Sequence, residues 1–75
     1  MEEKFYQLFA ETLEIEGEHN LSSTTVFREL EQWDSLAFLS VIAMIDEEYG
    51  IVIEGNDFKK LITLGDLISE IENRL

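Results

Sequence analysis

The chain has 75 residues, with 17 Asp plus Glu against 5 Lys plus Arg, and it contains neither cysteine nor proline. Its net charge of -12 excludes binding to nucleic acid or anionic lipid, because both would repel so negative a surface, and it predicts partners with basic surfaces. Without cysteine there is no disulfide scaffold and no thiolate metal site, so helix or sheet packing has to stabilise the chain.

Two features of the sequence bear on the location of the protein in the cell. The start, Met1-Glu2-Glu3, lacks the basic residues and the apolar run that open a secretory signal. The longest apolar stretch, residues 36–45, is interrupted by Ser40 and falls well short of the ~20 residues that a membrane-spanning helix requires. The sequence therefore predicts a soluble domain of the cytoplasm.

Residues 3–16 predict a first helix, because apolar residues recur along one stripe at the helical period. The stripe consists of Phe5, Leu8, Phe9 and Leu13. Gly17 is expected to end this helix, since glycine adopts the left-handed conformation without steric cost. Residues 18–33 predict a long loop, whose expected anchors on the core are Val26, Phe27, Leu30 and Trp33.

A second helix is predicted to begin after a cap at Asp34 or Ser35 and to stop at Gly50. One apolar stripe on it consists of Phe38, Val41, Ile42, Ile45 and Tyr49. A second stripe, on the opposite side, consists of Leu36, Leu39 and Ala43. A helix that is apolar nearly all round is either central to the core or presents one face to a partner.

The remaining elements are shorter. Residues 51–53 are β-branched but have no second strand to pair with, so they predict a packed loop. A short helical turn is expected from Gly55 to Leu61, and Thr63 with Asp66 predicts the capping box of a last helix. The expected fold class is all-α, a four-helix bundle with a short third helix and a long loop between helices one and two.

The tripeptide Asp34-Ser35-Leu36 heads an apolar helix that ends in Asp46-Glu47-Glu48-Tyr49. Together with the size, the acidic charge and the long loop, this arrangement resembles the acyl carrier protein family. The resemblance extends over nearly the whole chain and implies a single domain of residues 1–75. It includes the series Phe58, Leu61, Thr63, Leu64, Asp66 and Leu67.

In that family a serine is esterified with phosphopantetheine from coenzyme A, and the terminal thiol carries acyl groups as thioesters. The resemblance implies that Ser35 is this serine and that Asp34 caps the helix and helps a phosphopantetheinyl transferase to dock. Partner contacts are implied at Leu36, Leu39, Asp46 and Glu47. The chain would be a non-catalytic monomer that serves the transferase and acyl-transferring enzymes with basic docking patches.

Elementary chemistry agrees with this interpretation of Ser35. A phosphate ester there would lie at a helix N-terminus, where the exposed amides and the helix dipole favour an anion by about 0.3 to 1 kcal/mol. The chain has no thiol of its own, so thioester chemistry requires a prosthetic group. Ala37 and Ser40 stand where the fatty-acid type of carrier usually has further acids. This difference predicts a specialised carrier rather than the housekeeping one.

Other interpretations use the same residues. Ser35 could be an ordinary cap, and Leu36, Leu39 and Ala43 could be core residues. Within the family, an aminoacyl or peptidyl carrier remains open; outside it, so does an acidic interaction module without a prosthetic group. A hydrolase that uses Ser35, His19 and Asp34 is disfavoured, because so short a chain offers no evident oxyanion hole. His19 is expected to be a surface residue, and no metal site is expected.

Overall fold

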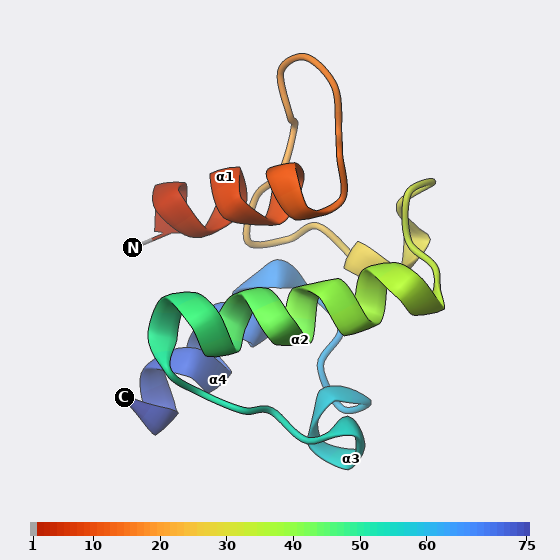
Figure 1. Cartoon of the computed structure of the whole chain (residues 1–75). Coiled ribbons are helices and arrows are strands. Elements are labelled where there is room, and N and C mark those ends of the chain that lie inside the picture. Colours follow the sequence, from red (N-terminus) through yellow and green to blue (C-terminus); the bar gives the residue numbers. More distant parts are fainter. Residues whose placement is uncertain (1) are drawn as a thin grey trace.

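The computed structural model describes residues 2–75 and folds them into four α-helices and one 3-10 helix (Figure 1). The elements are α1 (Glu2–Thr12), η1 (Phe27–Glu29), α2 (Ser35–Tyr49), α3 (Gly55–Phe58) and α4 (Leu64–Arg74). Helix α2 crosses the middle of the molecule, with α1 along one side and α3 at the other. The all-α prediction is confirmed, and no helix within residues 2–75 is long and apolar enough to cross a membrane.

Helix α1 ends four residues before the predicted boundary at residue 16, so the assignment of Gly17 as its terminator is wrong. The turn that closes it is a Schellman motif. Ile15 donates its N–H to the Ala10 carbonyl at 2.9 Å, and Glu14 donates to the Glu11 carbonyl at 3.1 Å. Glu14 occupies the left-handed position with φ of 57°. Packing of Ile15 against the core fixes this turn, although glutamate is a poor residue for it.

A group of aromatic side chains from different elements lies at the centre of a core that is otherwise mainly aliphatic. Phe5 and Phe9 of α1, Phe27 of η1 and Phe58 of α3 are fully or almost fully buried. Phe27 connects the two ends of this group, because its ring centroid lies 6.4 Å from that of Phe9 and 5.5 Å from that of Phe58. The predicted anchor role of Phe27 is therefore confirmed, and η1 is the element that seats it.

The long loop is fixed on the start of α4. Leu64 donates its N–H to the Thr25 carbonyl at 3.0 Å, and Gly65 donates to the Ser23 carbonyl at 2.9 Å. A Cβ on Gly65 would lie 2.9 Å from that Ser23 oxygen, so only glycine allows the close approach. The loop is thereby held against the start of α4 at Ser23 and Thr25.

The second half of the chain follows the prediction closely. Gly50 ends α2 in the left-handed conformation, with φ of 68°, and donates to the Asp46 carbonyl at 2.8 Å. Residues 51–53 form the expected packed loop. Thr63 and Asp66 form the predicted capping box, in which Asp66 accepts the Thr63 N–H at 3.0 Å and Thr63 accepts the Asp66 N–H at 3.1 Å. The α4 residues that face the core are Leu64, Leu67, Ile68 and Ile71.

Candidate functional site at the head of helix α2

Ser35 is the first residue of α2, directly after the cap. The Asp34 side chain accepts the Ala37 N–H at 2.7 Å, and its carbonyl accepts the Phe38 N–H at 3.0 Å. Of the two predicted caps, Asp34 is therefore the one that acts. Ser35 is exposed, and no hydrogen bond within the described part of the chain engages its hydroxyl.

The backbone at Ser35 favours an anion. The first turn of α2 contains no acidic side chain, so the adjacent carboxylate is that of the Asp34 cap, which lies before the helix. The amides of this turn other than that of Ala37 are free of side-chain caps among residues 2–75. A phosphate at Ser35 would thus meet the positive end of the α2 dipole.

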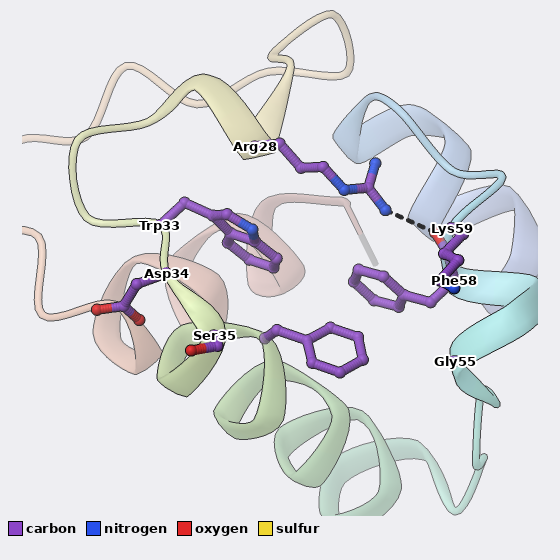
Figure 2. A pocket seen from close by; sticks show the side chains of 8 residues that line it. Arg28, Trp33, Asp34, Ser35, Gly55, Phe58 and Lys59 are labelled. Atoms are coloured by element: carbon purple, nitrogen blue, oxygen red, sulfur yellow. Dashed lines mark hydrogen bonds between the residues drawn. The ribbon is translucent and has the colours of Figure 1, made fainter.

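A hollow of about 500 Å³ lies beside Ser35, between η1, the head of α2 and α3 (Figure 2). Its lining residues are Arg28, Trp33, Asp34, Ser35, Phe38, Gly55, Phe58 and Lys59. In Figure 2 the rings of Trp33 and Phe58 face the same space, whereas the Asp34 carboxylate points away from it. The hollow is therefore apolar in its walls and carries two cationic side chains.

Trp33 is a wall of this hollow as well as the loop anchor that the sequence predicts. Its ring plane is within 4° of that of Phe9 and within 7° of that of Phe58, with a centroid distance of 6.2 Å in both cases. It also meets Phe27 edge to face at 5.0 Å. The residue that precedes the Asp34 cap is thus held by rings of α1, η1 and α3.

Arg28 is a structural residue of the site that sequence reasoning missed. Its guanidinium donates to the Phe58 carbonyl at 2.9 Å and also to the Leu61 carbonyl. The guanidinium carbon lies 4.8 Å from the Phe27 ring centroid and 5.6 Å from that of Phe58. Arg28 therefore joins η1 to the end of α3. The isolated Arg in an acidic loop gave no local signal of this role.

The second apolar stripe of α2, Leu36, Leu39 and Ala43, lies at the surface. Leu36 is 70% exposed and Leu39 is 60% exposed, and Ala43 is also at the surface. The alternative that these three are core residues is wrong. Farther along the helix, Asp46 and Glu47 are exposed, and neither forms an ion pair among residues 2–75.

Two other residues singled out by the sequence have different positions. Ala37 is buried, so its lack of charge reflects packing and says nothing about a partner surface, whereas Ser40 is only half-buried. His19 accepts the Leu21 N–H through Nδ1 at 3.2 Å within the long loop. Among residues 2–75, no hydrogen bond joins the side chains of Ser35, His19 and Asp34, and no cluster of metal-ligating side chains occurs.

Comparisons with known proteins agree with this geometry. The family model described as "Phosphopantetheine attachment site" matches residues 3–71. The acyl carrier protein of Shigella flexneri is 38% identical over 53 residues, which cover 71% of this chain and 68% of that protein, and the Shigella dysenteriae protein matches equally well. The chain therefore belongs to the family of acyl carrier proteins, which are non-catalytic carriers that bear phosphopantetheine.

Proposed function

We propose that Ser35 is the residue esterified with phosphopantetheine and that the chain delivers acyl groups in fatty-acid, polyketide or related specialised biosynthesis. The observation that carries this proposal is the position of Ser35, exposed and unbonded at the capped N-terminus of α2. When bound, phosphopantetheine supplies the thiol on which an acyl group is held as a thioester.

The residues around Ser35 suit the group. The α2 amides and dipole stabilise the charge of a phosphodiester at this point. Arg28 and Lys59 line the same hollow as Ser35 and add positive charge to a chain that is otherwise strongly acidic. Asp34, which already caps the helix, leaves a carboxylate at the surface for the basic surface of a phosphopantetheinyl transferase.

The exposed face of α2 provides the proposed partner contacts. Leu36 and Leu39 offer apolar surface near the attachment residue, and Asp46 and Glu47 offer negative charge farther along. Such an arrangement suits an acyl-transferring enzyme that has an apolar contact beside a basic patch. Because the first two turns of this face carry no acid, we infer a specialised set of partners rather than those of the housekeeping carrier.

An aminoacyl or peptidyl carrier is the nearest alternative, and the hollow weighs against it. An aminoacyl group carries an ammonium ion, which would lose hydration against the apolar walls of the hollow if the cargo entered it. The match to a phosphopantetheine attachment family likewise weighs against an acidic interaction module that has no prosthetic group.

The test is the intact mass of the chain after incubation with coenzyme A and a phosphopantetheinyl transferase. We expect wild type to gain one phosphopantetheine, Ser35→Ala to gain none, and Ser69→Ala, at an exposed serine of α4, to gain one. Ser35→Ala should keep its helical circular dichroism, because Asp34 and not Ser35 caps α2. Modification of Ser35→Ala, or no modification of wild type by a transferase that modifies another carrier, would refute the assignment.

A further inference from the structure

The hollow beside Ser35 has aromatic side chains in its walls. Three of its lining residues are aromatic: Trp33 before the α2 cap, Phe38 in the first turn of α2, and Phe58 at the end of α3. Trp33 and Phe38 are partly exposed and provide accessible ring surface, whereas Phe58 is 1% exposed and forms the floor. Anything that is tethered to Ser35 and enters the hollow therefore meets ring surfaces.

The rings are arranged around a common centre. The plane of Phe58 is within 7° of that of Trp33 at a centroid distance of 6.2 Å, and it meets Phe38 at 77° and 5.0 Å. A guest beside this floor can stack on one ring while it presents its edge to another. Offset-stacked and edge-to-face contacts are the two arrangements that aromatic rings prefer.

Two arginines fix the floor before any cargo arrives. Arg28 donates to the carbonyl of Phe58 from the η1 side. From the α4 side, Arg74 donates to Asp57 at 2.9 Å and to the Val52 carbonyl at 3.1 Å. The four-residue α3 is thus held on both flanks, so the hollow has a defined shape and little ordering of the walls is needed on binding.

We propose that this hollow selects, as cargo of the carrier, acyl groups with a planar aromatic body over saturated acyl groups of the same size. The inference rests on the proposed attachment at Ser35. A planar ring that lies against the accessible surfaces of Trp33 and Phe38 gains the aromatic contact in addition to apolar burial, whereas a saturated ring gains burial alone.

The experiment compares two acyl groups that are matched in size. The full chain is loaded by a phosphopantetheinyl transferase from benzoyl-coenzyme A or from cyclohexanecarbonyl-coenzyme A. The rate of thioester cleavage by hydroxylamine is then divided by the rate for the same acyl group on free pantetheine, which removes the difference in intrinsic reactivity. We expect the carrier to protect benzoyl more than cyclohexanecarbonyl by about 2- to 10-fold, the range of an aromatic pair.

Trp33 gives a second readout that does not depend on cleavage. It is the only tryptophan of the chain and lines the hollow, so benzoyl loading should change its emission more than cyclohexanecarbonyl loading does. Phe38→Leu should reduce the preference, because Trp33 remains, and Phe38→Tyr should keep it. Tyr49→Leu is the matched control, because it removes a partly buried ring from the same helix but from outside the hollow.

The outcomes separate the two proposals. If neither coenzyme A derivative adds mass to wild type, attachment at Ser35 fails and the cargo inference fails with it. If both groups load but show equal protection and equal emission, only the cargo inference is overturned. It is also overturned if Phe38→Leu loads and keeps the wild-type preference.

Discussion

Asp34 accepts the backbone N–H of Ala37 through Oδ1 at 2.7 Å, and this bond starts the helix on which Ser35 is the first residue. The same carboxylate is exposed and carries charge toward solvent. Asp34 therefore combines two roles that a substitution can separate, namely the capping of α2 and the negative charge beside the proposed attachment residue.

Asp34→Ala is expected to lower the free energy of unfolding by about 0.5 to 2 kcal/mol, because it removes the cap. Asp34→Asn keeps an acceptor oxygen and should stay within a few tenths of a kcal/mol of wild type. Chemical denaturation measures both. If the charge also serves the transferase, Asp34→Asn should still be modified more slowly than wild type. Equal modification rates would restrict Asp34 to its structural role.

Glu14→Gly is expected to stabilise the fold by about 0.5 to 1 kcal/mol, since glycine adopts the left-handed conformation that glutamate occupies here at a cost. The greater chain entropy of glycine in the unfolded state reduces the gain. Glu14→Gln is the control, because it removes the same charge and keeps the backbone cost. A gain of similar size in Glu14→Gln would assign the effect to charge.

Gly65→Ala is expected to destabilise the chain by about 1 to 3 kcal/mol, as overpacking does. The new Cβ would press on the Ser23 carbonyl oxygen, which is backbone and cannot turn aside. Gly55→Ala provides the matched case, because a Cβ there meets no atom within 4 Å. It should be neutral or stabilise by up to ~1 kcal/mol through helix propensity. Thermal melts of the two variants should therefore shift in different directions or by clearly different amounts.

The stability of the fold should depend on pH through the ionisation of Asp66. Its carboxylate accepts the N–H groups of Thr63 and Ile62, and these bonds lower its pKa below the ordinary value. In the unfolded chain the pKa of an Asp carboxyl is about 3.9, and above this pH the Asp66 carboxylate contributes its full stabilisation. This stabilisation is lost as the pH falls through the lower pKa that Asp66 has in the folded state. Asp66→Asn retains an acceptor without the charge. The stability advantage of wild type over this variant should therefore shrink below about pH 4.

Denaturation at a series of pH values tests this expectation. The control is Glu72→Gln, at an exposed carboxylate of α4 whose side chain accepts no hydrogen bond among residues 2–75. A constant difference between wild type and Asp66→Asn across the acid range would contradict the assigned pKa direction.

Reversal of both Asp46 and Glu47 to Lys should slow association with a cognate acyl-transferring enzyme. Exposed charges steer encounter, and their effect is screened beyond about 8 Å at physiological ionic strength, so the difference from wild type should shrink with added salt. The control is the double variant Glu16→Lys and Glu18→Lys, which changes the net charge by the same amount at exposed positions of the long loop. Stopped-flow association rates that fall equally for both pairs would show a general field effect and not a docking face.

Local signals in the sequence were sufficient for α2 and α4. Gly50 ends α2 because it has no side chain, and Thr63 and Asp66 begin α4 because their side chains cap it. Each of these boundaries could therefore be predicted from the residue types alone. The end of α1 could not. Glu14 adopts the left-handed conformation in a turn that packing of Ile15 against the folded core holds, and neither residue type signals such a turn.

The candidate site likewise has one part that the sequence predicts and one part that it does not. Ser35 and its cap could be predicted from the tripeptide and its context, because they belong to one helix start. The hollow could not, since Arg28 and Phe58 lie on η1 and α3, and only the folded chain brings them to Trp33 and Phe38 at the head of α2. The role of Arg28 could not be predicted, because its partners are the backbone carbonyls of Phe58 and Leu61, which have no sequence signature.

The attachment of the long loop to α4 has a consequence for the order in which the molecule forms. Ser23 and Thr25 are held by Gly65 and Leu64, which follow much later in the sequence. Contacts between residues so distant in sequence form late, because the entropy of closing the intervening loop has to be overcome first. During synthesis, the loop that leads to the head of α2 would therefore be fixed only after α4 has left the ribosome, so an incomplete chain would not yet hold Ser35, the proposed attachment residue, in its final surroundings.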